Sequence, residues 1–129
     1  MNIWVSTPSF ADMCLASPEF SSELLPALTT FIFCGETLAN KTVRRLRERF
    51  ANATIINTYG PTESTVAVTE VTVSDEMAAS AAPLPVGSPR PGTRLRIVDD
   101  EGHDVPAGAW GEVVIEGDTV AAGYWDRRD

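Results

Sequence analysis

Short hydrophobic runs separated by turn-forming residues divide the first half of the chain into strand-like segments. Residues 3–5 form a short alternating run, and residues 30–34 form a continuous aromatic and β-branched run that stops at Gly35. A continuous run of this kind is typical of a strand buried on both faces of a parallel sheet. The same reasoning predicts a second buried strand at residues 54–57, and the alternation of residues 65–73 predicts a further strand.

A first helix is predicted directly after residues 3–5. Ser6 or Thr7 is a suitable cap for it, and Pro8 is favoured near the first helical position. Hydrophobic residues then recur at helical spacing, namely Phe10, Met13, Cys14 and Leu15. Pro18 ends or interrupts this helix, because proline removes a backbone donor.

A second helix is predicted at residues 39–50, where hydrophobic residues recur in steps of four, three and four. They are Ala39, Val43, Leu46 and Phe50. The other face carries five of the ten basic residues of the chain: Lys41, Arg44, Arg45, Arg47 and Arg49. This face is either a docking or anion-binding surface or, as we favour, an ordinary solvated helix face.

The order strand, helix, strand is the repeating unit of a parallel α/β sheet. A turn-rich loop, residues 58–63, follows the strand at residues 54–57. Ligands of open α/β sheets bind at the carboxyl ends of the strands, so this loop is the first candidate for a binding site.

The composition changes after Ser74. The remaining segments are predicted in chain order as an Ala-rich stretch with one helical turn (75–83), a Pro/Gly-rich stretch (84–92), a strand (93–98), turns (99–108), a strand (111–116) and a helix start within 118–129. The chain therefore divides into an α/β segment, residues 1–78, and a β-rich segment, residues 79–129.

Composition limits the function classes. The 129 residues are 43% hydrophobic and 22% charged, which is ordinary for one globular domain. No hydrophobic stretch is long enough for a membrane span, and residues 1–5 show no secretory signal. The net charge of −8 makes the chain a poor candidate for binding a nucleic-acid backbone.

The cysteines and the single histidine exclude further chemistry. Cys14 and Cys34 have the spacing of neither a disulfide framework, a redox pair nor a zinc site. His103 is the only histidine and lies in an acidic turn, so neither a Cys/His metal site nor a Ser-His-Asp hydrolase is expected. A reducing, cytoplasmic location is the expectation that fits best.

Three motifs give the chain a family resemblance. The string Asn57-Thr58-Tyr59-Gly60-Pro61-Thr62-Glu63 resembles the core motif of the adenylate-forming enzymes, which include acyl-CoA synthetases, luciferases and peptide-synthetase adenylation domains. Residues 84–87 resemble the short Pro-x-Gly loop of that family. Residues 111–117 with Gly123 and Tyr124 resemble its Gly-Glu…Gly…Gly-Tyr motif. The resemblance implies part of a large N-terminal domain: a partial parallel sheet with helices, followed by a β-rich, partial-barrel segment.

A narrower resemblance suggests the substrate. Several further strings look like the family members that adenylate D-alanine: residues 5–10, 13–15, 24–26, 33–36 and 65–69. Such an enzyme uses ATP and Mg²⁺ and transfers D-alanine to the phosphopantetheine thiol of a carrier protein for teichoic-acid D-alanylation. The resemblance thus implies D-alanine and a carrier protein as partners, with no nucleic acid and no membrane insertion.

The resemblance also assigns roles to the nucleotide side of the site. Thr62 and Glu63 are the expected catalytic pair: the Thr62 hydroxyl and backbone N–H contact the α-phosphate, and the Glu63 carboxylate helps hold Mg²⁺. Tyr59 is expected against the adenine ring, and Asn57, Thr58 and Gly60 complete the nucleotide-binding set. On the residues alone, Glu63 is equally well an exposed carboxylate, Thr62 a cap and Tyr59 a core residue.

The substrate side is expected to involve Cys34, Gly60 and Val66. A thiol and an isopropyl group would give a small apolar wall suited to a one-carbon side chain. Gly60 would let the backbone approach the ligand closely. Without the family match, Cys34 is best explained as a small buried hydrophobic residue.

Parts of the family pattern are missing. Members of the family are much longer, and the phosphate loop, the ribose-binding Asp and the lid lysine have no counterpart in this sequence. We therefore expect an internal piece of the large N-terminal domain that is inactive alone. Two alternatives stay open: an adenylating domain for another amino or carboxylic acid, or a non-catalytic binding module.

Overall fold

A five-stranded mixed sheet is the main element of the computed structural model, which describes residues 1–127. Its strands are β1 (Ile3–Ser6), β2 (Thr30–Phe33), β3 (Thr54–Tyr59), β4 (Thr69–Thr72) and β5 (Ser88–Pro89), in the spatial order β1-β2-β3-β4-β5. The first three strands are parallel, and β4 and β5 are added antiparallel. The α/β class and the parallel start of the sheet are as predicted.

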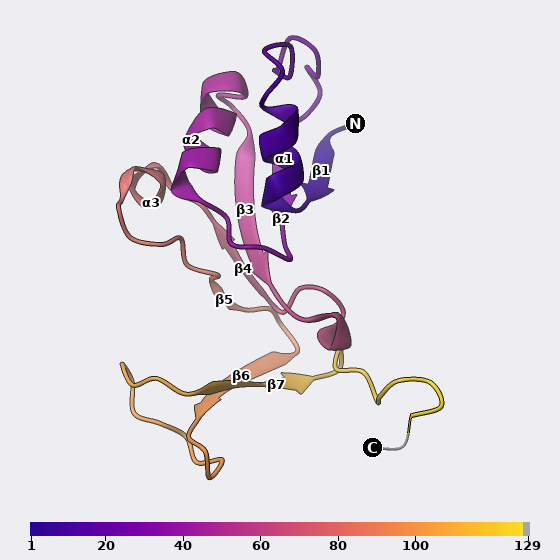
Figure 1. Cartoon of the computed structure of the whole chain (residues 1–129), viewed down its shortest axis with the longest axis vertical. Coiled ribbons are helices and arrows are strands. Elements are labelled where there is room, and N and C mark those ends of the chain that lie inside the picture. Colours follow the sequence, from indigo (N-terminus) through magenta and orange to yellow (C-terminus); the bar gives the residue numbers. More distant parts are fainter. Residues whose placement is uncertain (128–129) are drawn as a thin grey trace.

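The helices α1 (Pro8–Cys14), α2 (Asn40–Arg49) and α3 (Asp75–Ala79) pack around one face of the sheet (Figure 1). Phe31, Phe33 and Ile55 of the sheet meet Val43 and Leu46 of α2 in the core, and all five side chains are almost fully buried. The four-three-four spacing therefore correctly predicted Val43, Leu46 and Phe50 as buried, whereas Ala39, which precedes the helix, is exposed. Burial of several such side chains, each contributing about 1.5–3 kcal/mol, makes this core the main source of stability.

The opposite face of the sheet is only partly covered. Ile3 and Val5 of the edge strand β1 are more than half exposed, and Ile32 of β2 is half-buried. The prediction that residues 30–34 are buried on both faces is thus wrong for this chain. The helical spacing near α1 was read correctly only in part: Leu15 enters the core and Cys14 packs against it, but Phe10 and Met13 are exposed and Ala11 is the buried residue that the spacing missed.

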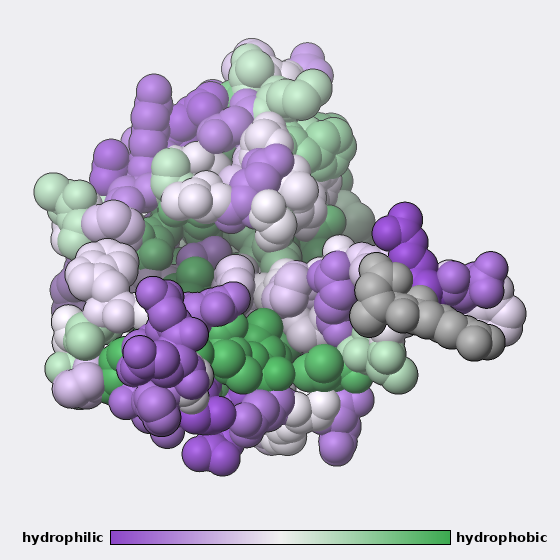
Figure 2. Space-filling model, turned by 60° about the horizontal axis from the view of Figure 1, so that its bottom comes forward, coloured by the Kyte–Doolittle hydropathy of each residue, from purple (hydrophilic) through white to green (hydrophobic). Residues whose placement is uncertain are grey.

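A separate antiparallel hairpin follows the sheet. β6 (Thr93–Val98) and β7 (Glu112–Gly117) pair over six residues each, close to the predicted ranges. The hairpin lies past the end of the sheet at which β3 terminates (Figure 1). Figure 2 looks onto this end of the molecule. The surface is hollowed beside the hairpin, and hydrophobic residues gather next to the hollow. Within residues 1–127 the β-rich part forms a two-stranded ribbon and no closed barrel.

Two predicted elements differ from the structure. The strand predicted at residues 65–73 covers only Thr69–Thr72, because Thr65 and Val66 adopt left-handed backbone conformations that no strand contains. The helix start predicted within 118–129 is absent from the described part, residues 118–127, which forms turns; residues 128–129 lie outside the description.

The division of the chain into two segments at residue 78 stays a prediction. No helix among the described residues is long and apolar enough to cross a membrane.

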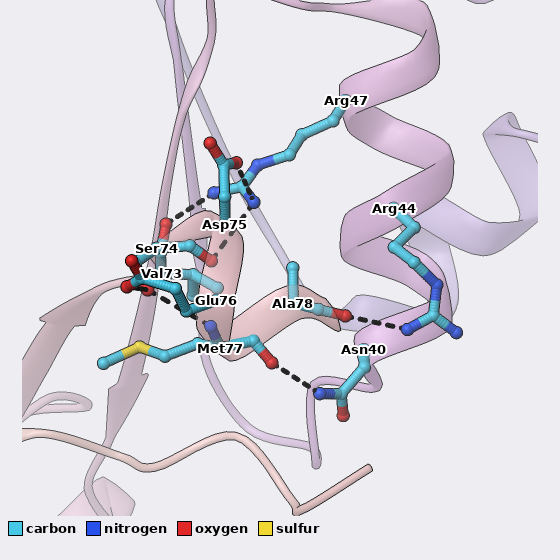
Figure 3. Close-up of polar contacts among 9 residues, drawn as sticks. All are labelled: Asn40, Arg44, Arg47, Val73, Ser74, Asp75, Glu76, Met77 and Ala78. Atoms are coloured by element: carbon cyan, nitrogen blue, oxygen red, sulfur yellow. Dashed lines mark hydrogen bonds and ion pairs between the residues drawn. The ribbon is translucent and has the colours of Figure 1, made fainter. Parts of the chain in front are cut away.

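The arginines of α2 connect the helix to neighbouring loops. Arg47 donates to the carbonyl oxygens of Val73 and Ser74 at 2.6 and 3.1 Å and pairs with Asp75 at 2.6 Å. Arg44 donates to the carbonyl of Ala78 at 2.7 Å (Figure 3). On the other side of α2, Arg45 reaches Asp12 and the Leu15 carbonyl, and Arg49 reaches the Pro18 carbonyl.

Asn40, at the first turn of α2, has a similar role, since its amide nitrogen donates to the carbonyl of Met77 at 2.9 Å (Figure 3).

The contacts of the arginines show that both explanations of the basic face of α2 were incomplete. The arginines donate mostly to backbone carbonyls, so they connect α2 to neighbouring loops and the face is not simply solvated. Lys41 and Arg44 are both exposed, but Arg44 also donates to the Ala78 carbonyl, so Lys41 fits the solvated description best.

Arg47→Met should destabilise the chain, whereas Lys41→Met should have little effect. The two changes remove the same charge, but only the first leaves two carbonyls without their cationic donor. Hydrogen bonds to charged groups contribute about 1.5–3 kcal/mol, so we expect a loss of about that size for Arg47→Met. Urea unfolding followed by tryptophan fluorescence measures both variants. Equal losses of unfolding free energy would contradict the assigned role.

Candidate functional site

A pocket of about 430 Å³ opens at the carboxyl ends of β2 and β3. The two strands pair in parallel with Phe33 opposite Asn57, so the residues that follow each strand emerge side by side. The pocket lies between these two segments and the loop before β5. It is lined by Gly35, Glu36, Thr37, Leu38, Asn57, Thr58, Tyr59, Gly60, Pro61, Leu84 and Val86. Its size falls within the range of about 300–1,000 Å³ that is typical of small-ligand sites.

Asn57 and Thr58 fix the shape of this pocket. The Asn57 amide nitrogen donates to the carbonyl of Pro85 at 2.8 Å, and the Thr58 hydroxyl donates to the carbonyl of Phe33 at 2.8 Å. Both residues are more than nine-tenths buried. These bonds hold β2, β3 and the loop at residues 84–87 together, so both residues build the pocket wall.

Tyr59 is the aromatic group at the pocket. It is the last residue of β3 and is 40% exposed, whereas Phe31 and Phe33 of the neighbouring strand β2 are fully buried. A flat, partly exposed ring at a strand end is suited to stacking on a planar ligand such as a nucleobase. The explanation of Tyr59 as a core residue does not fit this exposure.

Gly60 and Gly87 are needed for close approaches within the chain. A Cβ atom at Gly60 would lie 2.8 Å from the Val66 carbonyl oxygen and 2.9 Å from the Val68 nitrogen. Gly87 has a φ of +89°, and a Cβ there would overlap the Glu70 carbonyl. The close approach that the structure shows at Gly60 is thus to the chain's own backbone.

Cys34 and Val66 are in contact with each other, but neither belongs to the lining of this pocket. The Cys34 thiol donates to the Val66 carbonyl oxygen at 3.1 Å. Val66 itself has a φ of +72° and a side chain that is 59% exposed. A positive φ is unfavourable for a β-branched residue, and such strain is concentrated at functional sites.

Thr62 and Glu63 lie just beyond the pocket, on the 3₁₀ turn η1 (Thr62–Ser64) that follows Pro61. The carboxylate of Glu63 accepts a hydrogen bond of 2.5 Å from the Tyr124 hydroxyl. This bond lowers the pKa of Glu63 and raises that of Tyr124, because it favours the ionised carboxylate and the protonated phenol. An exposed, ionised carboxylate is a suitable hard oxygen ligand for Mg²⁺, so the residue fits that ion.

The structure thus groups the predicted residues into three neighbouring places. Asn57, Thr58, Tyr59 and Gly60 form the pocket, Cys34 contacts Val66, and Thr62 and Glu63 follow on η1. Sequence reasoning assigned no site role to the segment from Gly35 to Leu38, to Leu84 and Val86, or to Tyr124. All of these residues except Thr37 and Leu38 had a signal in the sequence, because residues 33–36, 84–87 and 123–124 carried the family resemblance.

Comparisons with known proteins agree with this arrangement. Residues 1–125 match the family model of the AMP-binding enzymes. Two curated relatives named D-alanine--D-alanyl carrier protein ligase come from Bacillus licheniformis and Lactiplantibacillus plantarum, at 51% and 50% identity over 124 residues. Each match covers 96% of this chain but only 25% and 24% of the relative, so the chain spans about a quarter of their length.

Solved structures show the same fold. The crystal structure of VinN matches with a TM-score of 0.81 and 30% identity, covering 98% of this chain and 31% of that protein. The anthranilate CoA ligase AuaEII in complex with anthranoyl-AMP matches with a TM-score of 0.80 and 28% identity, covering 98% and 23%. Because the family model matches residues 1–125 of the 129 residues, the chain belongs to the AMP-binding enzyme family.

Val66→Gly should give a more stable chain than Val66→Ala, which reverses the usual order of these residues. The left-handed conformation costs an L-residue about 1–2 kcal/mol, and glycine escapes that cost. At Ala67, whose φ is negative, Ala67→Gly should instead lose about 0.5–1 kcal/mol. Urea unfolding of the three variants checks the prediction. A Val66→Ala chain more stable than Val66→Gly would show that the turn is unstrained.

Proposed function

We propose that the protein containing this chain is an ATP-dependent ligase that adenylates D-alanine and transfers it to the phosphopantetheine thiol of a carrier protein. The carrier would serve teichoic-acid D-alanylation, and the reaction would take place in the cytoplasm. The observation that carries the proposal is the pocket at the ends of β2 and β3, lined by Asn57 to Pro61. The names of relatives about 50% identical over this region support D-alanine as the acid.

The alternative of another acid has weaker support. The solved structures in complex with anthranoyl-AMP and with L-aspartate are each 28% identical to this chain. The ligases named for D-alanine are about 50% identical over almost the same residues. The alternative of a non-catalytic module has no specific observation in its favour.

The reaction joins two anions. A carboxylate oxygen of D-alanine attacks the α-phosphorus of ATP, the bond to the β-phosphate breaks, and pyrophosphate leaves. In the second step the carrier thiol attacks the acyl carbon, its proton is lost, and AMP leaves. Bound Mg²⁺ would neutralise phosphate charge, and Glu63 is the residue of this chain that we expect to hold it.

The other residues have positioning roles in this proposal. Tyr59 would stack on adenine from its exposed position at the pocket, and Asn57, Thr58 and Gly60 shape the wall that holds it. Thr62 would offer its hydroxyl and backbone N–H to the α-phosphate. Cys34, with Gly60 and Val66, would limit the space for the substrate's side chain.

Full-length protein should catalyse D-alanine-dependent exchange of pyrophosphate into ATP, whereas residues 1–129 alone should not. The lining of the pocket contains no lysine or arginine, so the residues that line it supply no positive charge to a triphosphate. Exchange measured with D-alanine, L-alanine, glycine and benzoate tests the substrate. Exchange with benzoate but not with D-alanine would contradict the proposal, and activity of residues 1–129 alone would contradict the argument from charge.

Cys34→Ala in the full-length protein should relax the choice between the alanine enantiomers. Removal of the thiol opens space beside Val66, and one misplaced methyl group is worth about 1–3 kcal/mol in such a pocket. L-alanine should therefore gain on D-alanine by about tenfold or more in kcat/KM. Cys14→Ala, which removes the other thiol, is the matched control and should leave the ratio unchanged. An unchanged ratio in Cys34→Ala would show that selection takes place elsewhere.

A further inference from the structure

The segment after β7 returns to the loop after β3. Three hydrogen bonds join the two segments: Tyr124 hydroxyl to Glu63 Oε1 at 2.5 Å, Ala121 N–H to the Glu63 carbonyl at 2.6 Å, and Thr65 hydroxyl to the Thr119 carbonyl at 2.9 Å. The partners of these bonds are 54 to 61 residues apart in sequence. Glu63 is therefore held at both its backbone and its carboxylate by one segment.

We propose that Tyr124 is a positioning residue, which holds the Glu63 carboxylate in the orientation that the adenylation site uses. The inference rests on the proposed function, because it takes its meaning from the role of Glu63 there. It adds a role for the Gly123-Tyr124 motif, which lies outside the pocket and outside the predicted site.

Glu63 needs such a partner because little else restrains its side chain. It is exposed on the three-residue turn η1, where core packing does not fix its rotamer. The turn is followed directly by Thr65 and Val66, both at positive φ, so the loop stores backbone strain beside this carboxylate. The hydrogen bonds between residues 119–124 and this loop oppose its rearrangement.

The geometry leaves the carboxylate able to bind a ligand. A carboxylate has about four acceptor positions, and the Tyr124 hydroxyl occupies one of them. A donor that orients a ligating side chain from outside is a common arrangement, and its loss typically weakens metal affinity or activity about 10–100-fold.

Tyr124 contributes little to packing, which makes it a clean target for substitution. Its side chain is 62% exposed, so Tyr124→Phe removes the hydroxyl and its hydrogen bond while keeping the ring. Thr65→Val is the matched control: it removes the second side-chain bond between the same segments, to the Thr119 carbonyl, and does not touch the carboxylate.

The test uses full-length protein and two readouts. In D-alanine-dependent exchange, Tyr124→Phe should raise the half-saturating Mg²⁺ concentration about tenfold and leave the KM for D-alanine near that of the wild type. In the ligand-free protein, the Ala121 amide should exchange its hydrogen faster in both Tyr124→Phe and Thr65→Val. Thr65→Val should leave the Mg²⁺ dependence within about twofold of the wild type.

Two claims are tested separately: that the Tyr124–Glu63 hydrogen bond holds residues 119–124 against the loop after β3, here called the bracing contact, and that Tyr124 positions Glu63 for Mg²⁺. An unchanged Ala121 exchange rate in Tyr124→Phe would overturn the bracing contact, and an unchanged Mg²⁺ dependence would overturn the positioning role. Equal Mg²⁺ shifts in the two variants would also overturn it, because general loosening of the segment would then explain them. Wild-type protein without D-alanine-dependent exchange would overturn the proposed function and the positioning role with it, whereas the bracing contact would still be judged by hydrogen exchange.

Discussion

The parallel, in-register pairing of β2 with β3 is the constraint on which the site depends. Phe33 lies opposite Asn57, and the buried Thr58 hydroxyl bonds the Phe33 carbonyl. The chain leaving β2 at Gly35 therefore emerges beside the chain leaving β3 at Tyr59. A one-residue slip would turn the Phe33 side chain out of the core, so the same hydrophobic packing that stabilises the sheet also places the two walls of the pocket.

The second half of the chain completes this edge rather than forming an independent site. The loop at residues 84–87 closes the pocket and is held by Asn57 and by the Thr69 hydroxyl, which bonds the Val86 carbonyl at 2.7 Å. Farther out, residues 119–124 contact the Glu63 turn. The site is thus assembled from the end of β3 with the turn that follows it, the loop at residues 84–87 and residues 119–124, and the last two segments are held by hydrogen bonds to the first or to the strand beside it.

Much of the fold could be predicted because its elements follow from local pattern. The spacing of Val43 and Leu46 indicated the buried face of α2, and the alternation of residues 93–98 predicted β6. Period-two alternation also continues through Thr65 and Val66, but it carries no information on the sign of φ, so the strained turn was read as strand. The arginines of α2 were read as a surface because their carbonyl partners lie 26 to 34 residues away.

Part of the site could also be predicted from local sequence. The run from Asn57 to Glu63 is contiguous, so one motif located most of it, whereas the bond from Tyr124 to Glu63 spans 61 residues and depends on tertiary structure. Hydrogen bonding of Asn57 and Thr58 to backbone carbonyls likewise could not be read from residue type. A contiguous motif indicates which residues take part; the fold decides which of them face the ligand and which hold the wall.

The most direct measurement is a crystal structure of the full-length protein with a non-hydrolysable analogue of D-alanyl adenylate. We expect adenine against the Tyr59 ring, between the segment from Gly35 to Leu38 and the segment from Asn57 to Pro61, with the alanyl group toward Cys34 and Val66. An analogue bound away from the carboxyl ends of β2 and β3, with this pocket empty, would contradict it.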